Sequence, residues 1–108
     1  MKRQNAKSDA YVKQILDALE QWYKPDHPKA KIDAYRYNPA SIRIRIIDPD
    51  FDGLDLVERD ERVWPLLRRL PEEVRADVSM LLLLTPKENK RSFGSWEFDD
   101  PTPPPPDL

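Results

Sequence analysis

The stretch Ser41-Ile42-Arg43-Ile44-Arg45-Ile46-Ile47 decides the fold of this chain. Isoleucine stands at every second position, with arginine between. A β-strand turns alternate side chains to opposite faces, so the pattern predicts a strand with a buried isoleucine face and a solvated arginine face. β-Branched isoleucine also suits a pleated sheet better than a helix. The other elements are therefore placed by asking what covers Ile42, Ile44 and Ile46.

The segments before this strand predict a helix and a first strand. Apolar residues recur at helical spacing over Tyr11–Tyr23, after a predicted cap at Ser8 or Asp9, and Pro25 ends this helix. Lys31–Tyr37 is predicted as a strand. Turn residues follow it at once, so this strand and the isoleucine strand form an antiparallel hairpin.

The segments after the isoleucine strand complete an α+β domain. Leu54–Leu70 has a helical pattern that Pro65 interrupts, which predicts either two short helices or one kinked helix. Pro71-Glu72-Glu73 predicts a further short helical turn. Val78–Leu84 is short and apolar on both faces, and the capping-box sequence Thr85-Pro86-Lys87-Glu88 follows it, so it is predicted as a strand. A right-handed crossover makes this strand parallel to the isoleucine strand. The predicted fold is a three-stranded mixed sheet, in the order α-β-β-α-β-α, with the helices on one face.

Length and composition limit the functions that this chain can have. The 108 residues suffice for one domain, predicted over residues 8–90, with a flexible leader over 1–7. The 18 basic and 20 acidic residues give a net charge of −2, which does not favour indiscriminate polyanion binding. Absence of cysteine excludes disulfides, thiolate nucleophiles and cysteine-ligated metals. The longest apolar run, Met80–Leu84, is too short to cross a bilayer. We expect a cytoplasmic protein that does not bind membranes.

Residues 91–108 are first aromatic and then proline-rich. We expect this tail to be largely disordered or docked on the helix-free face of the sheet, with Phe93, Trp96 and Phe98 as the contacts. Pro101–Leu108 has the composition of a polyproline spacer, ligand or disordered end.

With these elements in place, the chain resembles the BolA-like family. The resemblance lies in the helix and hairpin, the turn Phe51-Asp52-Gly53, the helix with Arg59 and Trp64, and the final Thr85-Pro86-x-Glu88. It covers residues 10–90 and implies a fold similar to the type II KH fold. It also implies an iron–sulfur cluster shared with a monothiol glutaredoxin through a histidine at the start of the last strand.

This sequence departs from the family pattern at that histidine. Arg75–Met80 contains no histidine, and Asp60 stands where the family often has one after the helix arginine. The sole histidine, His27, precedes the hairpin. We therefore expect no family-type cluster ligation and no cofactor.

No other residue pattern predicts a reaction. Asp48, Asp50, Asp52 and Asp55 share a loop with Gly53, and we interpret them as turn-forming and capping residues rather than a calcium site. His27 beside Asp26 lacks the partners of a catalytic base. We expect no enzyme, no catalytic residue and no metal.

The leading hypothesis is therefore a non-enzymatic interaction domain that binds another protein through the arginine face of the sheet or through the Arg59–Arg69 helix. A single-stranded nucleic-acid module of KH type is the alternative, although the chain lacks its Gly-x-x-Gly loop. A homodimer that buries the leucine-rich strand or the tail is a third. The candidate binding residues are Tyr35, Tyr37, Arg43, Arg45, Arg59 and Trp64.

Overall fold

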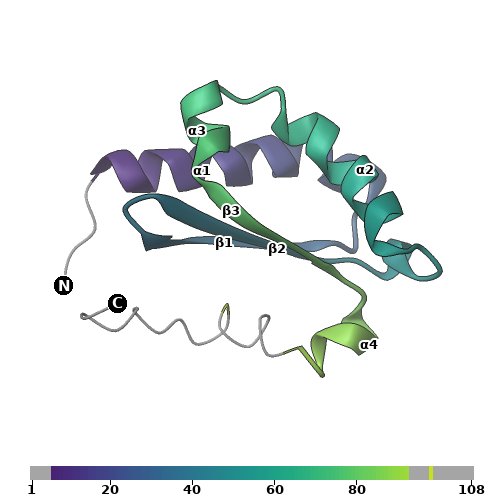
Figure 1. Cartoon of the computed structure of the whole chain (residues 1–108). Coiled ribbons are helices and arrows are strands. Elements are labelled where there is room, and N and C mark those ends of the chain that lie inside the picture. Colours follow the sequence, from purple (N-terminus) through teal and green to yellow (C-terminus); the bar gives the residue numbers. More distant parts are fainter. Residues whose placement is uncertain (1–5, 93–97, 99–108) are drawn as a thin grey trace.

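The sheet has β2 at its centre and the helices α1, α2 and α3 on one face (Figure 1). The computed structural model describes residues 6–92 and Phe98. The strands are β1 (Lys31–Asn38), β2 (Ser41–Ile47) and β3 (Val78–Leu84). The helices are α1 (Ala6–Trp22), α2 (Leu56–Leu67), α3 (Glu72–Ala76) and α4 (Pro86–Asn89), with 3₁₀ turns η1 (Lys24–Asp26) and η2 (Pro49–Phe51).

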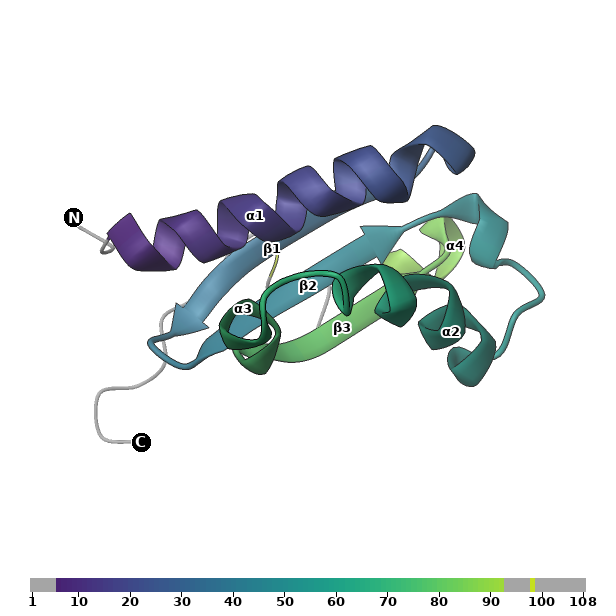
Figure 2. The same cartoon turned by 90° about the horizontal axis from the view of Figure 1, so that it is seen from above.

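The predicted topology is confirmed. The strand order is β1-β2-β3. β1 runs antiparallel to β2, and β3 runs parallel to β2. Seen from above in Figure 2, α1 lies along β1, and α2 and α3 lie over β2 and β3. The short α4 is on the opposite side, beyond the end of β3 (Figure 1).

Register assigns each strand residue to a face. Ile44 pairs with Ala34 on β1 and with Leu81 on β3, and all three face the helices. Arg45 pairs with Asp33 and Leu82 on the opposite face, which we call the lower face. The pairing of β2 with β3 skips one residue between Val78 and Met80. Met80, Leu82 and Leu84 therefore share the lower face.

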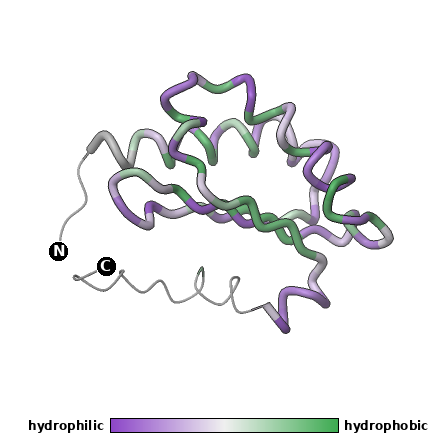
Figure 3. The backbone as a smooth tube through the Cα atoms, viewed as in Figure 1, coloured by the Kyte–Doolittle hydropathy of each residue, from purple (hydrophilic) through white to green (hydrophobic). Residues whose placement is uncertain are grey.

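The core lies between the sheet and the helices. Ile42, Ile44 and Ile46 are fully buried there, as the alternating pattern predicts, together with Ile15 and Leu19 of α1. Each such aliphatic side chain contributes about 1.5–3 kcal/mol through burial. Figure 3 shows hydrophobic residues concentrated in β2 and β3, whereas α4 is hydrophilic.

The start of α1 differs from the sequence prediction, and α2 corresponds to the single-helix alternative that the sequence left open. α1 begins at Ala6, so Ser8 and Asp9 lie inside the helix instead of capping it. α2 is a single helix that contains Pro65 close to its C-terminal end. Asp55 caps α2 and Glu58 completes the capping box, which stabilises the N-terminus of the helix. Among the described helices, none has the length and hydrophobicity that crossing a bilayer requires.

Candidate functional site

The lower face of the sheet carries four of the predicted binding residues. Tyr35 and Arg43 are direct cross-strand partners, so their side chains stand side by side on this face. Arg43 Nη1 donates a hydrogen bond to the Tyr35 hydroxyl at 3.1 Å, and the guanidinium carbon lies 3.6 Å from the centre of the Tyr37 ring. These contacts are cation–π and hydrogen-bond contacts within the chain.

Arg45 is not solvated, so the prediction of a wet arginine face is wrong at this residue. Its side chain is 1 % exposed. Its Nε and Nη2 donate to one carboxylate oxygen of Asp33, at 3.2 and 2.7 Å. A buried guanidinium needs such a partner, and the cross-strand acid supplies it.

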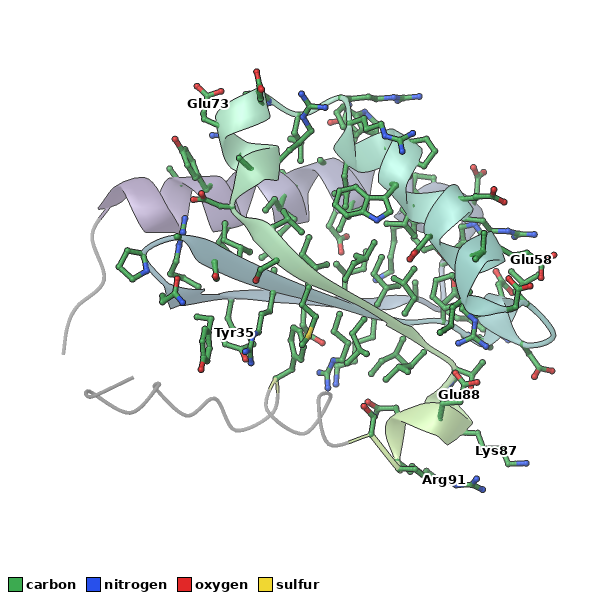
Figure 4. The ribbon with its side chains drawn as sticks, viewed as in Figure 1. Tyr35, Glu58, Glu73, Lys87, Glu88 and Arg91 are labelled. Atoms are coloured by element: carbon green, nitrogen blue, oxygen red, sulfur yellow. The ribbon has the colours of Figure 1, made fainter. Side chains whose placement is uncertain are left out.

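The aromatic residue Phe98 lies against the same face. Its ring makes an edge contact with Tyr35, with centroids 5.0 Å apart, and its centroid is 5.1 Å from the guanidinium carbon of Arg45. Figure 4 shows Tyr35 pointing away from the helices, toward this side. The predicted contacts Phe93 and Trp96 lie outside the described residues.

Arg59 is an internal residue rather than a surface one. Its side chain is 7 % exposed. Its Nε donates to the Leu54 carbonyl at 2.9 Å, and its Nη1 donates to the Leu83 carbonyl at 3.0 Å and to the Glu88 carboxylate at 2.6 Å. The hydrogen bond that Arg59 donates to Glu88 raises the pKa of Arg59 above its ordinary value, so the charge is permanent. Arg59 thus joins α2, β3 and α4, and its role in partner binding stays a prediction.

Trp64 lies on the outer surface formed by α2 and α3. It is half-buried, and it lines two adjoining shallow hollows on α2 and α3, of about 190 and 510 Å³. Arg68 also lines both. We call this surface the Trp64 groove; it is formed by Val57, Asp60, Glu61, Trp64, Pro65, Arg68, Glu72, Arg75 and Ala76.

The groove has an acidic end and a basic end. Asp60 and Glu61 lie on the N-terminal side of Trp64, and Arg68 and Arg75 on the C-terminal side, where Glu72 is the one acidic residue of the lining. Within the described part of the chain, neither Asp60, Glu61, Arg68 nor Arg75 makes a side-chain hydrogen bond or ion pair. The Arg75 Nε is even buried without an acceptor, an uncommon and costly arrangement.

Sequence reasoning selected Trp64 but missed these charged neighbours. The signal was the spacing of positions 57, 60, 61, 64 and 68, which places them on one side of a helix. It was overlooked because the sequence predicted either two short helices, the second beginning near Asp60, or one kinked helix.

The sole histidine lies far from the position that the resemblance implies for a cluster ligand. The resemblance places the histidine ligand at the start of β3, where Val78 pairs with Ile42 at the beginning of β2. His27 instead contacts Asp48, which follows the last residue of β2. The imidazole is therefore at the opposite end of the sheet from the expected position.

Comparison with known proteins gave two similar solved structures, both from Arabidopsis thaliana. The BolA domain of SufE1 is 18% identical, with a TM-score of 0.46 over 80% of this chain and 99% of that one. BolA1 is 21% identical, with a TM-score of 0.45 over 80% of this chain and 98% of that one. No family model matches the sequence, and no curated protein matches it. These likenesses concern the fold, and neither by itself assigns a function to this chain.

Proposed function

We propose that this protein is a non-enzymatic protein-interaction module of BolA-like type, without the family's iron–sulfur ligation, and that it docks its partner in the Trp64 groove. The observation that carries the proposal is a set of charges around a half-buried tryptophan that have no side-chain partner among the described residues. Tryptophan and arginine are the residues most enriched among those that dominate binding energy at protein interfaces. Val57, 65% exposed, extends the apolar part of this surface.

The partner that we propose is a second copy of the chain. The charges of the groove are arranged so that a two-fold axis through Trp64 makes them complementary. Asp60 and Arg68 are each four residues from Trp64, on opposite sides. When two α2 helices cross antiparallel at Trp64, Asp60 of each copy faces Arg68 of the other. Closed two-fold interfaces require this self-complementarity, in which residue i meets j and j meets i.

The contact is of the weak, reversible class. The groove spans one short helix and the beginning of another, and small interfaces of this kind support transient association. Exposed ion pairs contribute about 0.2–1 kcal/mol each, so the two symmetric pairs set the orientation and Trp64 supplies most of the buried area.

The lower face of the sheet is a less well supported docking surface. The nucleic-acid hypothesis needs Tyr35 and Tyr37 free for stacking and Arg43 and Arg45 free for phosphates. Arg45 is ion-paired with Asp33, and Phe98 contacts Tyr35. Over residues 6–92 and Phe98, by contrast, the side chains of Asp60, Glu61, Arg68 and Arg75 in the Trp64 groove make no hydrogen bond or ion pair.

Sedimentation analysis of charge variants tests the proposal. We expect the wild-type chain to dimerise reversibly between about 10 μM and 1 mM, the range typical of weak complexes. Because Asp60 and Arg68 are exposed, Arg68→Glu leaves the fold intact and opposes like charges, and it should weaken the dimer about ten-fold.

The double variant Asp60→Arg/Arg68→Glu provides the matched control. It inverts the polarity of the groove but keeps the two copies complementary, so the dimer should return. A wild-type chain that stays monomeric throughout this range would overturn the proposal. So would a double variant that dimerises no better than Arg68→Glu alone.

A further inference from the structure

His27, Asp48 and Asp50 bring one imidazole and two carboxylates together at the end of the sheet, away from the Trp64 groove. His27 Nδ1 lies 2.7 Å from Asp50 Oδ2 and 3.3 Å from Asp48 Oδ2. The donor atoms of all three residues lie within 4.8 Å of one another. His27 follows η1, and the two aspartates flank the start of η2, so segments far apart in the sequence build this cluster.

Hydrogen bonds and ring stacking hold Asp48 and His27 in place. The Asp48 carboxylate accepts a hydrogen bond from the Asp50 amide at 2.9 Å, and the Asp48 amide donates to the Leu84 carbonyl at 2.8 Å. The His27 ring stacks on Tyr23, with centroids 4.2 Å apart and planes 15° apart. Ligand groups that are already oriented lose little freedom on binding a metal.

Asp48 supplies a separate observation. It is completely buried, and its carboxylate has no lysine or arginine partner among the described residues. Its contacts are the Tyr23 hydroxyl at 2.6 Å, the Asp50 amide and His27. A carboxylate removed from water requires a compensating positive charge. Burial, and then the hydrogen bond to Asp48, raise the pKa of the Tyr23 hydroxyl far above its ordinary value, so this neighbour donates a proton and brings no positive charge.

We propose that His27, Asp48 and Asp50 form a binding site for a divalent transition-metal cation such as Zn²⁺. A proton on His27 Nδ1 can form a good hydrogen bond to only one carboxylate, whereas a metal cation placed between the donor atoms can bind all three side chains. Zinc binds histidine nitrogen and carboxylate oxygen at about 2.0–2.2 Å, which at the tetrahedral angle sets neighbouring donors roughly 3.3–3.6 Å apart. The 3.3 Å between His27 Nδ1 and Asp48 Oδ2 fits this separation. The 2.7 Å to Asp50 Oδ2 is a hydrogen-bond distance, and the exposed Asp50 side chain would have to move outward by a few tenths of an ångström to admit the ion. The imidazole favours zinc, nickel or cobalt over calcium and magnesium, which prefer oxygen alone.

The composition of the chain makes a metal-binding experiment easy to interpret. It has one histidine and no cysteine, so an imidazole-bound metal has only one possible location. In calorimetric titration of the metal-free full chain with Zn²⁺ at neutral pH, we expect one ion per chain. His27→Ala should weaken binding at least ten-fold, and Asp50→Asn should weaken it as well, because each removes a ligand. Asp26→Asn is the matched control, since Asp26 is exposed, adjacent in sequence and outside the cluster, and it should bind as the wild type does.

The ring signals of the sole histidine give a second readout that needs no variant. In the nuclear magnetic resonance spectrum of the wild-type chain they should move on addition of Zn²⁺ and stop moving at one equivalent. Circular dichroism checks that His27→Ala is folded; if it is not, the ring signals decide. Ring signals that do not respond, or a folded His27→Ala variant that binds as tightly as the wild type, would overturn the proposal.

Discussion

The guanidinium of Arg59 binds both carboxylate oxygens of Glu88, with Nη1–Oε1 at 2.6 Å and Nη2–Oε2 at 3.1 Å. This forked pair joins α2 to α4 across the end of β3, and Figure 4 shows Glu88 at the start of α4 beside that end. Two-point pairs of this geometry are the stronger kind of charged hydrogen bond.

Replacing Arg59 should therefore cost stability rather than partner binding. Arg59→Leu leaves the Leu54 and Leu83 carbonyls without their side-chain donor and Glu88 without its cation. We expect a loss of about 2–4 kcal/mol in the free energy of unfolding, measured by urea denaturation. Arg59→Lys restores the charge but not the forked geometry and should fall between Arg59→Leu and the wild type. Arg59→Leu within 0.5 kcal/mol of the wild type, near the usual scatter of surface substitutions, would contradict this role.

The same pair predicts acid sensitivity. The hydrogen bond from Arg59, followed by that from the Thr85 amide, lowers the pKa of Glu88 from 4.5 to about 2. Because the folded pKa lies below the unfolded one, the contribution is complete above about pH 4.5 and disappears as the pH falls toward about 2. The side chain is 45% exposed, so solvent screening leaves on the order of 1 kcal/mol.

The measurement is the free energy of unfolding against pH for the wild type and for Glu88→Gln. The glutamine keeps the shape of the side chain but cannot titrate. Its curve should be flatter between pH 4.5 and pH 2, and identical slopes for the two proteins would show that Glu88 is not responsible.

The contact of Phe98 with Tyr35 and Arg45 predicts a modest contribution to stability. Phe98→Ala removes an aromatic edge contact and a cation–π contact, so the free energy of unfolding should fall by about 1 kcal/mol. Phe98→Tyr keeps the ring and should stay close to the wild type. An alanine variant as stable as the tyrosine variant would argue against this contact in solution.

The alternating isoleucines were sufficient to predict the sheet, because period-two alternation leaves one way to bury Ile42, Ile44 and Ile46. The capping box at Thr85 likewise established β3, since Glu88 and Thr85 do bond each other's backbone in the structure. Such local signals involve residues close together in sequence, and the structure confirms them.

The burial and the partners of individual charged side chains could not be predicted from such local signals. Arg45 occupies a position that alternation assigns to solvent, but its burial depends on Asp33 across the sheet and on Phe98, far along the chain. His27 was paired with its sequence neighbour Asp26, whereas the fold brings it to Asp48 and Asp50. Partners of this kind are fixed by tertiary contacts, which residue spacing does not report.

Disulfide trapping tests the central claim, that two copies meet at the Trp64 groove, most directly. Pro65 is exposed beside the proposed two-fold axis, and the chain has no cysteine of its own. Two cysteines bridge only when their Cβ atoms come within about 4 Å. Under mild oxidation, Pro65→Cys should form a covalent dimer, whereas Gln14→Cys, on the exposed side of α1, should stay monomeric, and Arg68→Glu added to Pro65→Cys should suppress the product. Equal trapping at both positions, or none at Pro65→Cys, would contradict the account.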